Sequence, residues 1–396
     1  MGDLAGLPVV TPQTAEEVAR ALAAATAARR SVIVRGGGSK ATWGRPGAAD
    51  ELLSTSQLAR VIAHEQGDLT ATVEAGITLS ALNAALAAKG QWLPLESPFD
   101  RTTIGGTLAT NDAGPLRHRY GTPRDLLIGM RLATADGTLV TTGGNVVKNV
   151  AGYDLGKLVT GSLGNLAVIV AATFKLAPLP EAFGTKRFMF ADRTAAAEAA
   201  ALLSASQLEP VALDVRYHAP LSDQAIELLA RFGSTPAAVE AQMARAEHML
   251  AGCGVVGTRR VVGPLDAALW QRHIRRPWDE GGAVVRVSWL PARLGAVFTL
   301  LDEIRRRGVG IEFAGRAAVG AGILRLDAEP ATITGAIRTL RERFDVMGQF
   351  AILRAAPAVT SAFGLTEPPT GQHPLLGAIK QAFDPAGTLN RGGGMV

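Results

Sequence analysis

The hydrophobic positions of the first half of the chain follow helical and strand periods in turn. A capping box, Thr14 followed by Glu17, precedes apolar residues at helical spacing. Two alternating runs around Asp136-Gly137 have the pattern of a hairpin. These patterns predict helices at 11–30 and 78–90, strands at 31–35, 69–78 and 166–176, and a hairpin at 127–142.

The second half, from residue 181, alternates short strand-like runs with amphipathic helices. This arrangement predicts an antiparallel sheet covered by helices. The predicted strands are 185–190, 211–217, 283–290, 321–328 and 349–356. The predicted helices are 193–206, 220–231, 235–251, 291–307 and 329–343. Because strands and helices follow no strict βαβ order over the whole chain, we predict an α+β fold.

Composition and charge narrow the class of protein. The chain has 396 residues, of which 47% are hydrophobic and 19% charged, so it is long enough to fold into two or three globular domains. The net charge is +5, but the arginines are dispersed and aromatic residues are 5%, which argues against nucleic-acid binding. No apolar run reaches the ~20 residues of a membrane span, and no secretory signal is visible. We therefore expect a cytoplasmic protein, with at most peripheral attachment to the inner membrane.

Three glycine-bearing stretches are the candidate ligand sites. In the first, the strand 31–35 runs directly into Gly36-Gly37-Gly38-Ser39. Successive glycines after a strand can aim several N–H groups at one anion, such as a phosphate. The spacing is not that of a Walker A loop, and an ordinary glycine turn is an equal alternative.

The second stretch, Pro94–Gly121, has too many Gly, Pro, Thr and Asn residues for a helix, so it predicts a ligand-binding loop. Gly105-Gly106 would let the backbone approach a ligand closely. Nearby hydroxyl and amide side chains could hydrogen-bond a polar ligand: Thr102, Thr103, Thr107, Thr110 and Asn111. The third stretch places the turns NVAGYDL and GSLG before the strand 166–176.

These three stretches, in this order, resemble the FAD-binding domain of the vanillyl-alcohol oxidase/p-cresol methylhydroxylase (PCMH) superfamily. Within it, VVKNVAGYDLGKL and the chain length resemble the FAD-binding subunits of glycolate oxidase of the GlcE type. The resemblance implies a two-part PCMH-type FAD-binding domain with an α+β cap. The implied segments are the FAD domain at 1–180, the cap at 181–355, and a C-terminal segment at 356–396 that returns to the FAD domain.

The resemblance also implies a role for each matching residue. The pyrophosphate would be held from one side by Gly36, Gly37, Gly38 and Ser39. It would be held from the other side by Thr103, Ile104, Gly105, Gly106 and Thr107. The ribityl and flavin end would lie along Thr110, Asn111 and Gly114, with Asn390 of the DPAGTLNRGG tail nearby. The adenosine half would be bordered by Gly161, Gly164 and Val168. Since the first loop contains no His or Cys, we expect non-covalent FAD.

Catalytic residues are harder to find. Several of the predicted strands of the second half carry one arginine each: Arg216, Arg286, Arg325 and Arg354. We interpret these arginines as lining an exposed sheet face; the alternative is a site that binds a carboxylate through a bidentate fork. The histidines are isolated, so we expect no metal, and His273 is a weak catalytic candidate because polar and aromatic residues surround it.

The resemblance implies a FAD-binding subunit of a glycolate oxidase (glycolate/D-lactate dehydrogenase) complex. Its partners would be a GlcD-like FAD dehydrogenase subunit and a GlcF-like iron–sulfur subunit, acting on a small 2-hydroxy acid. The single cysteine, Cys253, fits this division of labour, because this chain alone cannot hold an iron–sulfur cluster. Two alternatives are a self-contained 2-hydroxy-acid dehydrogenase or oxidase that uses the cap arginines, and a scaffold that has lost FAD.

Overall fold

The chain folds into two compact units, each described here by itself. The computed structural model describes residues 6–43, 49–144, 154–219, 225–363 and 373–391. The first unit comprises residues 1–113, 121–179 and 365–396, and the second comprises residues 114–120 and 180–364. Among the described residues, no helix combines the length and the apolar content needed to cross a membrane.

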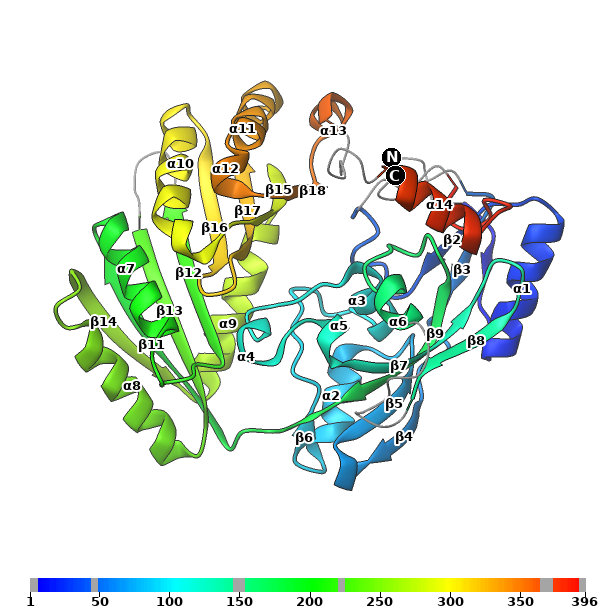
Figure 1. Cartoon of the computed structure of the whole chain (residues 1–396), viewed down its shortest axis with the longest axis horizontal. Coiled ribbons are helices and arrows are strands. Elements are labelled where there is room, and N and C mark those ends of the chain that lie inside the picture. The colour runs from blue at the N-terminus through cyan, green and yellow to red at the C-terminus, as the bar shows by residue number, and fades with distance from the viewer. Residues whose placement is uncertain (1–5, 44–48, 145–153, 220–224, 364–372, 392–396) are drawn as a thin grey trace. The chain divides into compact units, whose positions relative to one another are not determined.

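The first unit contains three sheets (Figure 1). A parallel sheet has the order β1 (Val9–Val10), β3 (Glu51–Ser54), β2 (Val32–Arg35). An antiparallel sheet has the order β4 (Val61–Glu65), β5 (Thr70–Glu74), β9 (Val168–Lys175), β7 (Leu127–Ala133), β8 (Leu139–Gly143). A short antiparallel pair joins β6 (Gln91–Trp92) and β10 (Ala177–Pro178). The predicted strands of this half, including the 127–142 hairpin, are confirmed.

The helices of the first unit begin at side-chain caps that the sequence shows. Thr14 Oγ1 accepts a hydrogen bond from Glu17 N (3.2 Å), and Thr78 Oγ1 accepts one from Ala81 N (3.2 Å), so both predicted helices are confirmed. The helices are α1 (Ala15–Ala27), α2 (Leu79–Ala87), α3 (Ile104–Thr110), α5 (Pro123–Leu126), α6 (Leu155–Val159) and α14 (His373–Phe383).

Two apolar cores hold this unit together. One core lies between the five-stranded sheet and helices α2 and α3, and includes Val73, Leu82 and Phe174. The other includes Val18 and Leu22 of α1 and packs this helix against strands of both larger sheets. Because α3 takes part in the first core, the segment that follows Thr103 is fixed by burial of apolar side chains.

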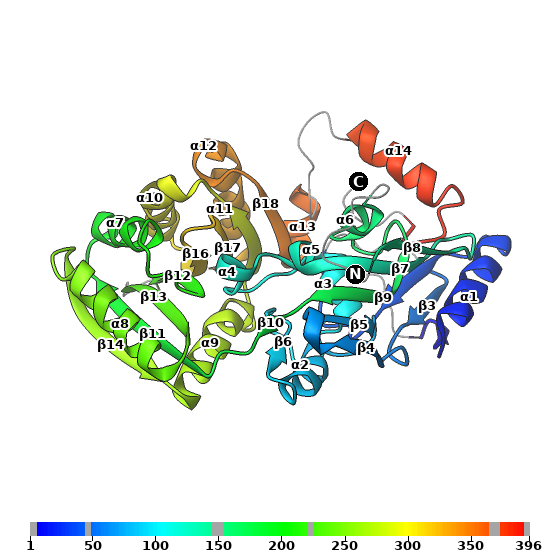
Figure 2. The same ribbon diagram turned by 60° about the horizontal axis from the view of Figure 1, so that its bottom comes forward.

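The second unit is built on one antiparallel sheet of eight strands (Figure 2). Its order is β14 (Val255–Val262), β11 (Ala182–Phe190), β13 (Ala225–Ser234), β12 (Ala212–Ala219), β16 (Gly310–Arg316), β17 (Ala321–Asp327), β15 (Ala283–Ser288), β18 (Phe350–Arg354). Its helices are α4 (Arg117–Tyr120), α7 (Arg193–Ser204), α8 (Pro236–Leu250), α9 (Pro264–Arg275), α10 (Leu294–Arg306), α11 (Pro330–Glu342), α12 (Phe344–Met347) and α13 (Pro357–Phe363). The predicted α+β class and helix-covered antiparallel sheet are confirmed.

The element order shows an internal repeat that the sequence did not reveal. Elements β11-α7-β12-β13-α8-β14 and β15-α10-β16-β17-α11-β18 each form a βαββαβ motif. The two motifs have mirrored strand orders and join at the β12–β16 pair. The central strands β12 and β16 therefore bring residues from both motifs side by side.

One prediction in this half is wrong. Residues 220–231 were expected to form a helix, whereas residues 225–234 form strand β13. Its Leu and Ala side chains have helical spacing, but Leu228, Leu229 and Ala230 are all fully buried between β11 and β12. A central strand that is apolar on both faces cannot be distinguished from a buried helix by periodicity. Strands β14 and β16 and helix α9 were not predicted.

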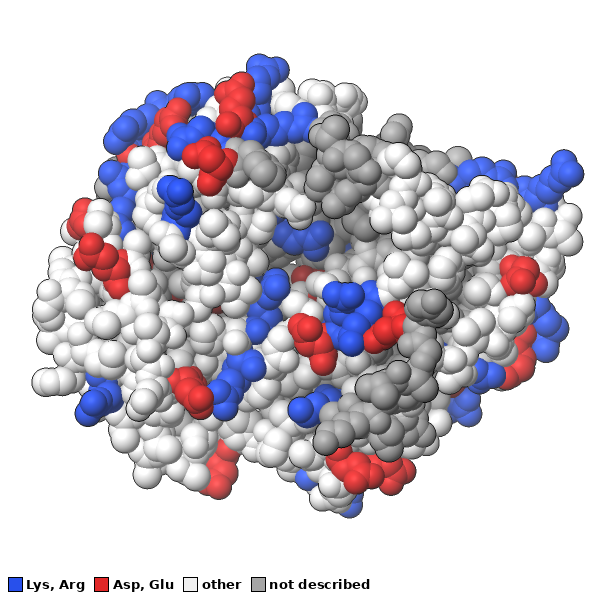
Figure 3. All heavy atoms as spheres, viewed as in Figure 1, with Lys and Arg blue, Asp and Glu red and all other residues white. Residues whose placement is uncertain are grey.

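The two faces of the eight-stranded sheet differ in chemistry. Helices α7, α8, α10 and α11 cover one face, where Tyr217 of β12 packs against Phe298 of α10 with ring centroids 5.9 Å apart. The other face contacts α4, α9 and the 3-10 turn Arg276–Trp278, and bears charged side chains. At the outer surface of α10 and α11, basic and acidic side chains are intermixed (Figure 3).

Candidate functional site

A cavity in the first unit is lined by segments from four distant parts of the sequence. They are the end of β2 with the glycine loop, the first turns of α3, the GSLG turn, and the C-terminal tail. The lining residues are Ile33 to Ala41, Trp43, Leu52, Thr103, Gly106, Ala109, Thr110, Leu163, Gly164 and Asn390. Glycines, small side chains and backbone therefore form most of its wall.

The glycine loop follows directly from β2. Gly38 has φ +74°, a conformation that side chains disfavour. A Cβ on Gly36 would overlap the Thr103 side chain, and a Cβ on Gly37 would overlap the carbonyl oxygen of Arg101. The two segments therefore contact each other through glycine backbone, and only glycine permits this approach.

The segment 104–110 is a helix, α3, so the prediction of a continuous loop over Pro94–Gly121 is wrong. Thr103 caps the helix by accepting a hydrogen bond from Gly106 N (3.2 Å). Ile104 and Leu108 are fully buried, and this burial outweighs the poor helix propensity of the glycines. Gly105 packs against the backbone of Ala75.

The structure brings nine of the predicted FAD-contacting residues to this cavity. They are Gly36, Gly37, Gly38, Ser39, Thr103, Gly106, Thr110, Gly164 and Asn390. The remaining seven do not line it: Ile104, Gly105, Thr107, Asn111, Gly114, Gly161 and Val168. Asn111 ends α3 in a left-handed conformation, and Val168 is buried in the core beneath α1. Gly114 belongs to the second unit. Part of the third motif, residues 145–153, lies outside the described residues.

A buried ion pair beside the glycine loop was missed by the sequence reasoning. Lys40 Nζ lies 2.8 Å from Asp112 Oδ2, and the two side chains are only 5% and 15% exposed. Lys40 lines the cavity and Asp112 follows the end of α3. The pair therefore ties the two cavity segments together. The signal for it was a lysine directly after Ser39 of the glycine loop, but its acidic partner lies 72 positions away and cannot be identified from spacing.

The predicted cap arginines lie on a single face of the second unit's sheet. Residues directly opposite in antiparallel pairs project to the same face. Arg216 is paired opposite Ala314, Ala314 opposite Ile323, and Ile323 opposite Arg286, so Arg216 and Arg286 project to the same face. Arg325 and Arg354 are both paired opposite Val284 and share a face in the same way. Arg286 is exposed as expected. The expectation of exposure is wrong for Arg216 and Arg325, whose side chains are only 18% and 17% exposed.

A buried carboxylate gathers several cations on this face. Glu312 accepts contacts from His218 Nδ1 (2.6 Å), Arg276 Nε (2.8 Å) and Arg216 Nε (3.5 Å). Burial raises the pKa of Glu312, against the opposing attraction of Arg276 and His218. Arg216 also approaches Glu227, at 3.6 Å.

His273, the weak catalytic candidate, is buried inside the second unit. Its Nε2 lies 2.8 Å from Asp214 Oδ2, and the two side chains are 2% and 0% exposed. Arg316 Nε is 3.9 Å from the same Asp214 oxygen. Burial lowers the pKa of nearby His118, and the charge of Asp214 partly opposes this effect. A histidine so enclosed has the environment of a structural residue.

Comparison with known proteins identifies the class of the first unit. Residues 7–143 match the family of FAD binding domains. The 208-residue segment similar to the glycolate oxidase subunit GlcD of Bacillus subtilis is 31% identical and covers 52% of this chain and 44% of that protein. The segment similar to the subunit GlcE of Escherichia coli is 37% identical over 153 residues and covers 38% of this chain and 43% of that protein. The chain thus spans less than half the length of these relatives.

Two further likenesses extend over nearly the whole chain. An uncharacterized FAD-linked oxidoreductase of Mycobacterium tuberculosis is 27% identical, with 96% of this chain and 89% of that protein covered. The solved structure of p-cresol methylhydroxylase aligns with a TM-score of 0.73 at 16% identity, covering 96% of this chain and 87% of that one. The fold is therefore the PCMH-type FAD-binding fold with a large antiparallel cap sheet, and FAD is the cofactor.

The cavity fits such a cofactor on its own chemistry. Consecutive glycine N–H groups and the buried Lys40 ammonium suit an anionic diphosphate, and the glycine contacts with Thr103 and Arg101 leave the loop no room for side chains. Among the described residues, no group of three or more His, Cys, Asp or Glu side chains could hold a metal ion.

Proposed function

We propose that this chain is the FAD-binding subunit of a glycolate oxidase (glycolate/D-lactate dehydrogenase) complex. The observation that carries the proposal is the cavity of the first unit, where three separated motifs and the tail meet. Similarity to GlcE and GlcD subunits supports the choice of complex. In this role the chain belongs to an FAD-dependent oxidoreductase and holds FAD non-covalently.

The residues of the first unit would perform the binding. Gly36 to Ser39 would donate backbone N–H bonds to the diphosphate, and Thr103 and Gly106 would close on it from α3. Lys40, fixed by Asp112, would add a cation beside the loop. Bound FAD would supply two-electron oxidation and onward electron transfer.

The need for partner subunits follows from what this chain can hold. Its one cysteine cannot bind an iron–sulfur cluster, which requires about four ligands. Electrons leaving the flavin would therefore pass to centres on other chains. A GlcD-like dehydrogenase would oxidise the small 2-hydroxy acid, and a GlcF-like iron–sulfur subunit would receive electrons.

The test combines co-purification with an anaerobic spectrum. A tagged chain should co-purify with a second flavoprotein and an iron–sulfur protein. Adding glycolate or D-lactate to the isolated, FAD-loaded chain without oxygen should leave the flavin band unchanged, whereas the assembled complex should bleach. Bleaching of the isolated chain would contradict a subunit role. Flavin that stays on the denatured chain would contradict non-covalent binding.

A second candidate, a self-contained 2-hydroxy-acid dehydrogenase, is favoured by one observation in the second unit. Arg325 Nε has no hydrogen-bond partner among the described residues, and Arg325 Nη2 lies 3.9 Å from Asp327 Oδ2. Arg354 donates to backbone carbonyls, and burial, followed by the charge of Arg325, lowers its pKa. The neighbouring guanidinium groups of Arg325 and Arg354 could together bind the carboxylate of an acid substrate.

This candidate has its own test. If the isolated chain bleaches with glycolate, Arg325→Met should raise the KM for the acid about tenfold or more, because a charge-assisted hydrogen bond contributes ~1.5–3 kcal/mol. Arg260→Met, which removes an exposed arginine paired with Glu240 on the same unit, should leave the KM unchanged. Equal KM values for both variants would exclude the cap arginine from substrate binding.

A further inference from the structure

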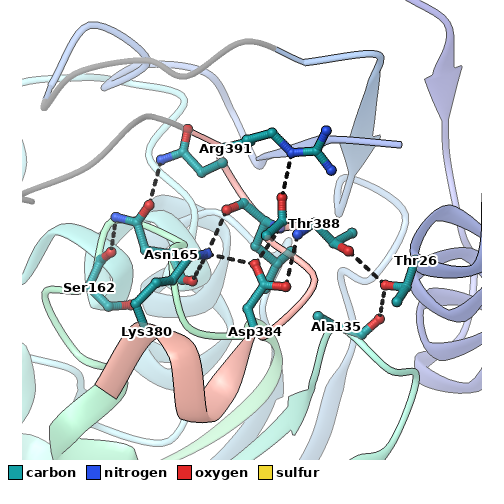
Figure 4. A network of polar contacts seen from close by, with 11 residues as sticks. Thr26, Ala135, Ser162, Asn165, Lys380, Asp384, Thr388 and Arg391 are labelled. Carbon is teal, nitrogen blue, oxygen red and sulfur yellow. Dashed lines mark hydrogen bonds and ion pairs between the residues drawn. The ribbon is translucent and has the colours of Figure 1, made fainter. Parts of the chain in front are cut away.

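The chain after α14 forms a tight turn around one buried carboxylate. The Asp384 side chain is fully buried; its Oδ1 accepts a hydrogen bond from Thr388 N (2.8 Å) and its Oδ2 accepts one from Leu389 N (2.7 Å) (Figure 4). The turn brings the tail alongside β2, where Val32 N donates to Thr388 O (2.8 Å) and Asn390 N donates to Val32 O (2.8 Å). The tail thus lies next to the strand that leads into the glycine loop.

A single ammonium group connects this tail to the GSLG turn. Lys380 Nζ, on α14, donates to Asp384 Oδ2 (2.6 Å), to Leu389 O (2.8 Å) and to Asn165 O (2.8 Å) (Figure 4). An ammonium has three donors, so all of them are used. Lys380 therefore joins its own helix, the tail and the residue that follows the GSLG turn.

These contacts converge on two residues of the cavity wall. Asn165 follows Gly164, which lines the cavity, and its Oδ1 accepts a hydrogen bond from Asn390 Nδ2 (3.0 Å). Asn390 lines the cavity from the tail side. Lys380 itself does not line the cavity. Its bonds to Asn165 O and Leu389 O hold the neighbours of the two wall residues, Gly164 and Asn390, in place.

The GSLG turn is in turn bonded to α3. Gly161 N donates to Leu108 O (2.9 Å), and Leu163 N donates to Ala109 O (2.8 Å). The hydrogen bonds therefore run from α3 through the GSLG turn and Lys380 to the tail, and from the tail to β2 and the glycine loop. Lys380, beside the Asn390–Asn165 side-chain bond, links the α3 side of the cavity to the C-terminal side.

We propose that Lys380 is a positioning residue for FAD binding, which fixes the GSLG turn and the Asn390 tail as one wall of the cofactor cavity. Without the ammonium, Asp384 and two backbone carbonyls lose their shared donor, and the side-chain bond from Asn390 to Asn165 is left to tie the tail to the GSLG turn. In that variant the wall is ordered only when FAD binds. This ordering costs free energy, so the affinity for FAD falls. The proposal concerns FAD binding and holds for either function proposed above.

The experiment titrates FAD into the FAD-stripped full chain and follows flavin fluorescence, with thermal unfolding of the same apoprotein measured in parallel. Lys380→Met should weaken FAD binding about tenfold or more, as expected for loss of charged hydrogen bonds. Lys380→Arg should recover part of the affinity. Lys157→Met, which breaks an exposed Lys–Asp pair of the same unit, should bind FAD like the wild type.

A second pair of measurements separates positioning from general stability. Asn390→Ala should add less to the loss in the Lys380→Met background than it causes alone, because both residues act on the same wall. If Lys380→Met does not fold, Asp384→Asn is titrated by the same criterion, since it keeps the shape of the turn and removes the charge. Folded variants with lower melting temperatures but wild-type FAD affinity would overturn the proposal.

Discussion

The cavity of the first unit and the charged sheet face of the second unit have opposite chemical character. In the first unit small residues form more than half of the cavity lining; Lys40, in the lining, is matched by Asp112, and Lys380, outside it, is matched by the buried Asp384. In the second unit the charged sheet face carries more cations than carboxylates. Its arginines include Arg187, Arg216, Arg276, Arg325 and Arg354, and its carboxylates include Glu227 and Glu312.

Because the two surfaces are built differently, different kinds of substitution should disrupt them. A site made of backbone N–H groups depends on the path of the chain, so added volume disrupts it, and a charge matters there where its bonds fix that path. A site made of side-chain charges depends on which partners remain after one is removed. The comparison therefore predicts that steric changes have the largest effect in the first unit, and that loss of a charge partner matters in both units.

The largest effect is expected for Gly37→Val. Its Cβ would overlap the carbonyl oxygen of Arg101, so the glycine loop has to move away from the segment before α3. Overpacking of this kind costs ~3 kcal/mol or more, and FAD affinity should fall about a hundredfold. The measurement is the flavin content of the purified chain together with an FAD titration.

The matched control is Gly67→Val, which adds the same side chain to a glycine of the same unit with open space around it. It should retain FAD. Equal flavin content in both variants would mean that the Gly37 contact does not shape the cofactor site.

Lys40→Met tests the matched charges of the first unit. Removing the ammonium leaves Asp112 mostly buried without its cation, at a cost of ~3 kcal/mol in the free energy of unfolding. FAD affinity should also fall, since the cation beside the glycine loop is lost. The double variant Lys40→Met/Asp112→Leu should recover most of the stability but not the affinity, which denaturant unfolding and FAD titration measure separately. Recovery of both would exclude Lys40 from cofactor binding.

His273→Ala tests the second unit in the same way. It leaves Asp214, which is fully buried, without its imidazole partner, so the unfolding free energy should fall by ~2 kcal/mol. FAD affinity should not change. His248→Ala, at an exposed site on α8, is the control and should alter neither quantity. A variant of His273 with normal stability and altered turnover would restore its candidacy as a catalytic residue.

The same contrast explains how far the sequence alone could go. Glycines and helix caps act locally, so Gly36 to Ser39, Thr103 and Thr78 could be recognised from their neighbours in the sequence. The positions of the second unit's charged residues depend instead on the register of the paired strands. Arg216 and Arg286 share a sheet face only because two unpredicted features, strand β16 and the β12–β16 pairing, place them there. No spacing in the sequence encodes that arrangement.

Local sequence patterns also could not predict which side chains are buried. The helix α3 forms despite its glycines because Ile104 and Leu108 enter the core, and residues 225–234 form a strand because neighbours bury both of their faces. Ion pairs such as Lys40–Asp112 depend on the same long-range arrangement. Tertiary packing thus overrode propensity in both segments whose secondary structure was predicted wrongly.

The smallest effect is expected from the titration of His118 in the second unit. Burial lowers the pKa of His118 below its ordinary value of 6.5, with Asp214 partly opposing the shift. As the pH falls below 6.5, the unfolded chain binds this proton before the folded chain does, so stability present above pH 6.5 is lost until the lowered folded pKa is reached. The melting temperature of the wild type should therefore fall more than that of His118→Gln between pH 8 and about pH 5.5, where titrating histidines respond. His248→Gln, at an exposed histidine, should follow the wild type. Parallel melting curves for the wild type and His118→Gln would show that the unfolded and folded chains bind this proton alike.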